Sequence, residues 1–104
     1  MNGEAKAATA PRPKRPRPAL ATGYVAPRGA LERTLARFWE DVLAVEPVGV
    51  DDDFFDLGGE SLHAFALLAR VAGEWDVALA PRDLFAYPSV GAMAAVVAAK
   101  RPRR

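Results

Sequence analysis

The stretch DFFDLGGESL occupies residues 53–62. Its two phenylalanines can anchor a loop against a core, and its two glycines allow backbone conformations that other residues avoid. Ser61 follows them and is of a residue type preferred at the N-cap of a helix. The stretch therefore predicts a packed loop that ends where a helix begins, with the Ser61 hydroxyl displayed near unpaired backbone N–H groups.

Helical periodicity flanks this loop on both sides. A first helix over about 30–45 is marked by apolar residues three and four apart, namely Leu31, Leu35, Phe38 and Val42, with Trp39 and Leu43 beside them. The connection 46–59 contains too many apolar residues for a solvated loop, so we expect it to pack on the helices. A second helix should run from Ser61 to Gly73 or Glu74, where the glycine is a plausible stop.

Two more helices complete the predicted fold. A short helix is expected over 81–87, because Pro81 suits a first helical turn. A last helix should begin after Ser89 and end near Lys100, with Val90, Met93 and Val97 on one face. The sequence has no alternating strand pattern. The predicted class is all-α, a small antiparallel bundle of three main helices and one short helix, with a long loop before the second.

Charge and composition divide the 104 residues into a body and two tails. Residues 1–27 are rich in proline, lysine and arginine, which predicts a disordered tail or linker. Residues 28–99 should form one domain, and residues 100–104 are a second basic tail. Residues 19–99 hold five Lys and Arg against twelve Asp and Glu, a formal charge of −7. We therefore expect protein partners that present basic surfaces.

Several classes of function are excluded by residues that the chain lacks. It has no cysteine, so disulfides, thiolate metal sites and a cysteine nucleophile are ruled out. No apolar run resembles a signal peptide or a membrane span. We expect a cytoplasmic monomer without a metal. The start at Met1 and the single domain favour a free-standing protein, although a piece excised from a multidomain protein would look similar.

Several blocks of the sequence, taken in order, resemble the peptidyl carrier (thiolation) domains of nonribosomal peptide synthetases. The blocks are YVAPR at 24–28, the helix around Leu31, GVD at 49–51, the 53–62 stretch and LFAYPSV at 84–90. The family pattern Gly-Gly-x-Ser-Leu is matched at Gly58, Gly59, Ser61 and Leu62. Glu60 departs from it, because this position more often holds His or Asp.

The resemblance implies a carrier rather than an enzyme. It implies that Ser61 bears a covalent 4′-phosphopantetheine arm, derived from coenzyme A, whose thiol holds an amino or acyl group as a thioester. The implied partners are a phosphopantetheinyl transferase and adenylation, condensation, tailoring or thioesterase enzymes. An acyl carrier of a polyketide-type pathway is the alternative within the same chemistry.

The helix after Ser61 has two apolar faces. At about 100° per residue, Leu62, Phe65 and Ala69 share one arc, whereas Ala64, Leu67, Leu68 and Val71 share another. One arc can serve the core, and we expect the arc next to Ser61 to dock partner enzymes. The predicted docking residues are Leu62, Phe65 and Ala69, together with Phe55, Leu57, Glu60 and Phe85.

Other functions fit the sequence less well. A serine hydrolase is disfavoured because His63, the only histidine, lies two positions after Ser61 on one helix and points away from it. The run Asp51 to Asp53 does not continue as a calcium-binding loop, and we interpret it as a solvated acidic loop or a docking surface. A helical interaction module that binds nucleic acid through its basic tails remains an alternative, which the acidic body disfavours.

Overall fold

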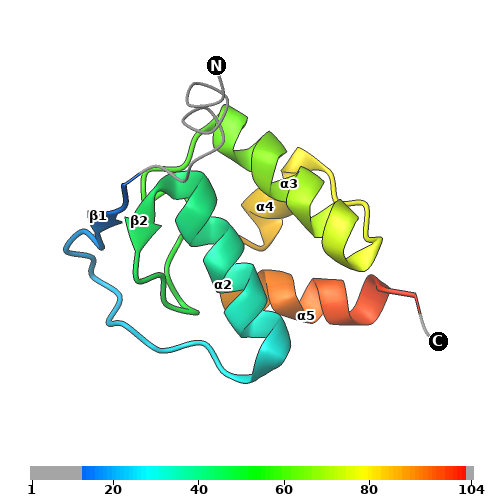
Figure 1. Ribbon diagram of the computed structural model, residues 1–104, viewed down its shortest axis with the longest axis horizontal. Coiled ribbons are helices and arrows are strands. Elements are labelled where there is room, and N and C mark those ends of the chain that lie inside the picture. Colours follow the sequence, from blue (N-terminus) through cyan, green and yellow to red (C-terminus); the bar gives the residue numbers. More distant parts are fainter. Residues whose placement is uncertain (1–12, 103–104) are drawn as a thin grey trace, which may run out of the picture.

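A computed structural model describes residues 13–102, and it is helical as predicted. Its helices are α2 (Gly29–Leu43), α3 (Ser61–Trp75), α4 (Pro81–Ala86) and α5 (Val90–Lys100). Two short strands, β1 (Arg15–Pro16) and β2 (Val45–Glu46), pair in parallel. The sequence pattern did not indicate these strands. The described part of the chain confirms the all-α class with three main helices and one short helix (Figure 1).

Helix α2 lies at the centre and packs against both α3 and α5 (Figure 1). Its buried stripe includes Leu35, Trp39 and Val42, which confirms the periodicity seen in the sequence. The helix ends at Leu43, two residues earlier than predicted, because Ala44 adopts a left-handed conformation with φ of 56°. The chain then enters β2, which could not form if the helix continued.

The long connection between α2 and α3 packs on the helices, as predicted. Its buried residues include Val48, Val50, Phe54 and Leu57. The Phe54 ring meets the Trp39 ring edge-on, with 5.1 Å between the ring centroids. Two backbone hydrogen bonds tie the connection to the start of α5, from the Phe54 N–H to the Pro88 carbonyl and from the Gly91 N–H to the Val50 carbonyl. The loop before Ser61 is therefore part of the folded core.

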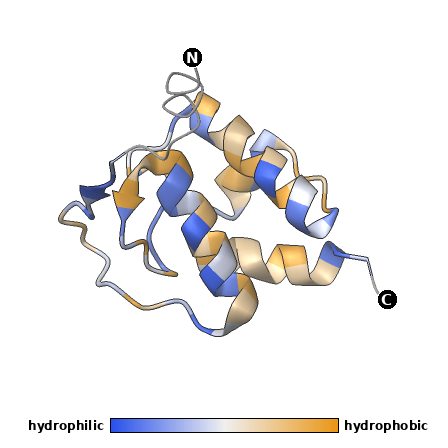
Figure 2. Ribbon diagram, viewed as in Figure 1, coloured by the Kyte–Doolittle hydropathy of each residue, from blue (hydrophilic) through white to orange (hydrophobic). Residues whose placement is uncertain are grey.

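Helices α4 and α5 follow within one residue of the predicted bounds. The Ser89 hydroxyl caps α5 by accepting a hydrogen bond from the Ala92 N–H at 3.2 Å. Val90, Met93 and Val97 are buried, which confirms the predicted face. Figure 2 shows that α5 is apolar along most of its length. This apolar helix packs against α2.

Part of the expected N-terminal tail lies against the domain. Of residues 1–27, the structure describes 13–27, and residues 1–12 lie outside it. Residues 15–16 form β1, Leu20 packs on the core, and the Val25 carbonyl accepts a hydrogen bond from the Val50 N–H at 2.9 Å. The structure differs here from the expectation of a disordered tail, because backbone pairing and side-chain contacts order an extended segment that has few apolar residues of its own.

None of the helices within residues 13–102 combines the length and the hydropathy that crossing a membrane requires.

Helix α3 does not stop at Gly73 but continues to Trp75, and it ends where Asp76 turns left-handed with φ of 57°. A methyl group at Gly73 would meet no atom within 4 Å. Gly73→Ala should therefore raise the free energy of unfolding by about 0.5–1 kcal/mol, since glycine is entropically unfavourable inside a helix. Urea denaturation measures the change.

Gly29→Ala is the matched control, because Gly29 also has open space around it but has φ of +72°. Gly29→Ala should therefore lower the free energy of unfolding by about 1 kcal/mol. Equal effects of the two substitutions would contradict this account of both glycines.

Candidate functional site

Ser61 is the first residue of α3, and its side chain is exposed. The sequence suggested that Ser61 would be the N-cap, but Glu60 holds this position with extended backbone angles, φ of −133° and ψ of 177°. The Ser61 hydroxyl is therefore not needed to start the helix. It lies in the first turn, where unpaired N–H groups and the helix dipole give a positive potential.

His63 supports the start of α3. Its Nδ1 atom accepts a hydrogen bond from the Glu60 N–H at 3.0 Å. The side chain is half-buried and satisfies a backbone donor that would otherwise be free at the start of the helix. An imidazole nitrogen occupied in this way is not available as a base for Ser61.

A tight turn precedes Ser61 and is fixed at both ends. At its start, the Asp53 carboxylate accepts hydrogen bonds from the N–H groups of Phe55 (2.8 Å) and Asp56 (3.1 Å). At its end, Gly58 has φ of +99°, a conformation that favours glycine. The Gly59 N–H donates to the Phe54 carbonyl at 3.0 Å, and a side chain on Gly59 would collide with the Phe54 ring. The structure thus explains why glycine occupies both of these positions in the sequence motif.

The two arcs predicted on α3 are confirmed. Its buried residues are Ala64, Leu67, Leu68 and Val71. On the other arc Leu62 is 81% exposed and Phe65 is 58% exposed, and Ala69 is exposed one turn further along. Helix α3 therefore contributes to the core with one face and leaves an apolar face uncovered next to Ser61.

Aromatic side chains from the loop and from α4 extend this apolar face. The rings of Phe55 and Phe85 are stacked, with 4.9 Å between centroids and 15° between planes, and Phe85 is 71% exposed. A hollow of about 70 Å³ opens beside Ser61 and is lined by both rings and by Phe65. We define the Ser61 face as Ser61, Leu62, Phe65, Phe55 and Phe85.

Leu57 does not belong to this face. Its side chain is 3% exposed and lies in the core, although the sequence suggested it as a docking residue. The turn that brings Phe55 outward carries Leu57 inward. Leu57 therefore offers no surface to a partner.

The acidic residues of the loop also differ in exposure. Asp51, Asp56 and Glu60 are exposed, as a docking surface requires. Asp52 is fully buried and paired with Arg17, so the expectation of a solvated run of three aspartates is wrong at its middle residue. Neither Asp52 nor Arg17 was singled out from the sequence, because nothing in the local pattern distinguishes them from their charged neighbours.

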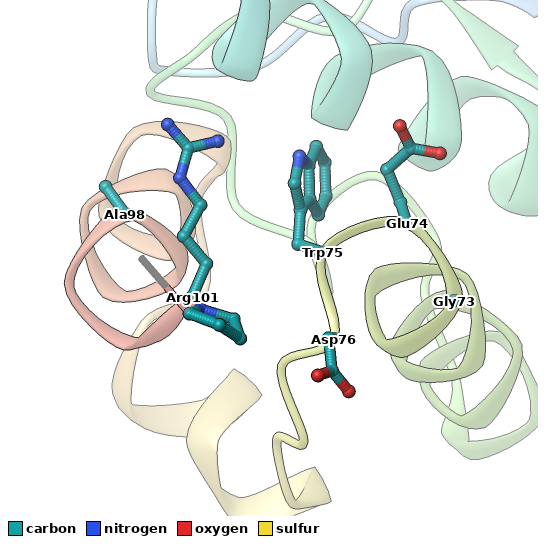
Figure 3. A pocket seen from close by; sticks show the side chains of 7 residues that line it. Gly73, Glu74, Trp75, Asp76, Ala98 and Arg101 are labelled. Atoms are coloured by element: carbon teal, nitrogen blue, oxygen red, sulfur yellow. The ribbon is translucent and has the colours of Figure 1, made fainter. Parts of the chain in front are cut away.

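A larger hollow, of about 1230 Å³, lies elsewhere. It is lined by the ends of α3 and α5, about 20 Å along α3 from Ser61 at 1.5 Å per residue. Figure 3 shows the Glu74 and Asp76 carboxylates pointing in different directions around Trp75, so they do not converge on one ligand. Within residues 13–102 no group of three or more potential metal ligands occurs either. The small hollow beside Ser61 is therefore the better candidate site.

Comparisons with known proteins agree on one family. Residues 33–97 match the family described as "Phosphopantetheine attachment site". A plipastatin synthase of Bacillus subtilis (strain 168) is 50% identical over 74 residues, which are 71% of this chain but 3% of that protein. The chain thus spans a small fraction of the length of this curated relative.

Solved structures show the same fold. An active-site mutant of a peptidyl carrier protein is 41% identical with a TM-score of 0.76, over 84% of this chain and 97% of that one. A peptidyl carrier protein solved with the phosphopantetheine transferase Sfp and coenzyme A is 45% identical with a TM-score of 0.72, over 74% of this chain and all of that one.

The contact between Gly59 and Phe54 leads to a prediction. Gly59→Ala should lower the free energy of unfolding by about 1–3 kcal/mol. The new methyl group would overlap the Phe54 ring and would lie 2.7 Å from the backbone carbonyl oxygen of Phe54. Thermal denaturation measures the loss. An unchanged melting temperature would mean that the turn can move away from the ring, and so is not fixed by it.

Proposed function

The chain belongs to the phosphopantetheine attachment site family and, within it, to the peptidyl carrier proteins, and from this membership we propose that Ser61 bears the 4′-phosphopantetheine arm. Ser61 lies inside the matched residues 33–97. It is also the serine of the Gly-Gly-x-Ser-Leu motif. The exposed position of its hydroxyl at the start of α3 is the observation that carries the proposal.

The residues around Ser61 fit the attached group chemically. A phosphodiester is an anion, and the first turn of α3 offers backbone N–H groups and the positive end of the helix dipole. The turn at Gly58 and Gly59 leaves the hydroxyl open to an approaching enzyme. When bound, the arm supplies a thiol that holds an acyl group as a thioester, which no side chain of this cysteine-free sequence can do.

The proposed role is transport for nonribosomal peptide synthesis. Tethering raises the local concentration of the cargo at each partner active site. Catalysis belongs to the partners, because His63 is engaged by the Glu60 N–H and offers Ser61 no base. Peptidyl carrier proteins among the solved structures favour this branch over an acyl carrier of a polyketide-type pathway.

The proposed partners are a phosphopantetheinyl transferase and the adenylation, condensation, tailoring or thioesterase enzymes that load, use or release the cargo. We propose that they dock on the Ser61 face. Leu62, Phe65 and Phe85 supply exposed apolar area there, and the exposed carboxylates of Asp56 and Glu60 favour a partner with a basic rim. Ala69 extends the docking surface by one helical turn.

Intact-protein mass spectrometry tests the attachment site. After incubation with coenzyme A, magnesium and a broad-specificity phosphopantetheinyl transferase, the wild-type protein should gain the mass of one phosphopantetheine and Ser61→Ala should gain none. Because Ser61 is exposed and is not the N-cap, the substitution should change stability by no more than about 0.5 kcal/mol.

Ser89→Ala is the matched control, because Ser61 and Ser89 are the only serines of the sequence. This variant should lose about 1 kcal/mol with the α5 cap and still be modified. Modification of Ser61→Ala, or none in folded wild-type protein, would remove Ser61 from the proposed function.

Substitutions on α3 test the docking surface. Leu62→Asp and Phe65→Asp should each raise the transferase KM for the carrier at least about fivefold, since each removes apolar contact area of the kind that dominates binding. Their circular dichroism and melting temperatures should stay near those of the wild type. Steady-state kinetics measures the effect.

Ala72→Asp serves as the control, since Ala72 is also exposed on α3 but about three turns from Ser61. It should leave KM within about twofold of the wild type. A KM increase of the same size at Ala72 would show that added negative charge, rather than lost contact, explains the effect.

A further inference from the structure

The chain before α2 lies along the molecule as an extended strap, which we define as residues 13–27. The Arg15 N–H donates to the Ala44 carbonyl at 2.8 Å, and the Arg17 N–H donates to the Glu46 carbonyl at 3.0 Å. Lys14 pairs with Asp41 of α2 at 3.1 Å. The strap is therefore held to the end of α2 and to the residues that follow it.

The Asp41 carboxylate is a firm anchor for the strap. Burial alone would raise the pKa of Asp41, but hydrogen bonds from Lys14 and from Arg70 of α3 outweigh it and lower the pKa. The carboxylate is thus charged at neutral pH and joins the strap to two helices.

The Arg17 side chain reaches from the strap to the loop before Ser61. Its Nε donates to Asp52 Oδ2 at 2.8 Å, and its Nη2 donates to Asp52 Oδ1 at 2.7 Å. The same Nη2 also donates to the Thr22 carbonyl at 2.7 Å, and the guanidinium lies 5.7 Å from the centre of the Tyr24 ring. This two-point geometry is available to arginine and not to lysine.

Asp52 uses the same carboxylate to shape the loop. Its Oδ2 accepts a hydrogen bond from the Gly49 N–H at 2.8 Å, and its own N–H donates to the Gly49 carbonyl at 3.2 Å. Because the Asp52 side chain is fully buried, loss of Arg17 would leave a buried charge without its cation. The loop would then have to open to bring Asp52 to water.

A short chain of contacts leads from Asp52 to Ser61. The next residue, Asp53, caps the turn through the N–H groups of Phe55 and Asp56. Phe54 then packs against Gly59, two residues before Ser61. Movement of the loop at Asp52 would therefore be passed to the turn, to the Phe55 ring on the Ser61 face and to the start of α3.

We propose that Arg17 is a positioning residue for the reactions at Ser61, acting through Asp52 to hold the loop in the shape that presents the Ser61 face. The inference rests on the function proposed for Ser61. Arg17 lies outside the family match at residues 33–97, whereas Asp52 lies inside it, so the strap adds a contact to the matched region from beyond its boundary.

The test uses the full chain with Arg17→Ala and, as the matched control, Arg15→Ala. Both residues lie at the strand pair, but the Arg15 side chain is exposed. Arg17→Ala should raise the transferase KM for the carrier at least about fivefold, because a surface that is no longer held in its binding shape must be ordered when the enzyme binds. Arg15→Ala should stay within about twofold. Arg17→Lys should fall between the wild type and Arg17→Ala.

Amide hydrogen exchange provides a readout that does not depend on the transferase. In Arg17→Ala the N–H groups of Leu57, Gly58 and Gly59, which donate to carbonyls within the turn, should exchange faster. The amides of Ala94 to Lys100, in the later turns of α5, should keep their wild-type rates. The Gly91 N–H is not part of this control, because it donates to the Val50 carbonyl of the loop. If the wild-type protein is not modified at all, the proposed function fails, and the exchange rates still decide whether Arg17 holds the loop.

Val97→Ala separates positioning from general loss of stability, since Val97 is a fully buried residue of α5. Kinetics should be compared at a temperature at which both variants are folded. An equal rise of KM in Val97→Ala would overturn the proposal, as would wild-type KM and exchange rates in Arg17→Ala. If Arg17→Ala does not fold, Arg17→Lys decides the question through the same two measurements.

Discussion

The packing of Gly59 against the buried Phe54 ring is the contact on which the arrangement around Ser61 depends. Phe54 is held in the core by Trp39, and no side chain fits between its ring and the backbone of Gly59. The chain must therefore leave the core after Phe54, turn once and return to the same ring. Because α3 starts two residues later, a buried aromatic residue determines where an exposed serine lies.

Helix α3 packs into the core with one face and exposes an apolar face on the other side. Leu67 and Val71 are buried against the other helices, while Leu62 and Phe65 on the opposite arc stay exposed. Since both faces belong to one rigid helix, the surface beside Ser61 is as well ordered as the core beneath it. The Ser61 face that we propose for docking thus rests on an ordered helix, and the exposed Glu60 lies directly before Ser61 in the chain.

Local spacing explains how far the sequence could predict the structure. The stripe of α2 and the two arcs of α3 follow from residues three and four apart, and both were predicted from the sequence. The helix ends were less predictable, because Ala44 and Asp76 are left-handed without being glycine. Tertiary contacts override local preference at such positions.

The candidate site was predictable to the same degree. Its exposed residues Ser61, Leu62 and Phe65 follow from the motif and from helical geometry. The burial of Asp52 does not, because its partner Arg17 lies 35 residues earlier in the sequence. The prediction that Leu57 is a docking residue was wrong for a similar reason. The direction of a side chain in a turn depends on hydrogen bonds that residue spacing does not reveal.

The stack of Phe55 on Phe85 has a consequence for how long a partner can stay bound. Each ring already covers part of the other, so a visiting enzyme gains less contact area than two free phenylalanines would offer. Small interfaces dissociate quickly, and differences in affinity between related complexes arise mainly from the dissociation rate. If partners dock where we propose, this self-contact would shorten each encounter, which suits a carrier that must leave one enzyme before it reaches the next.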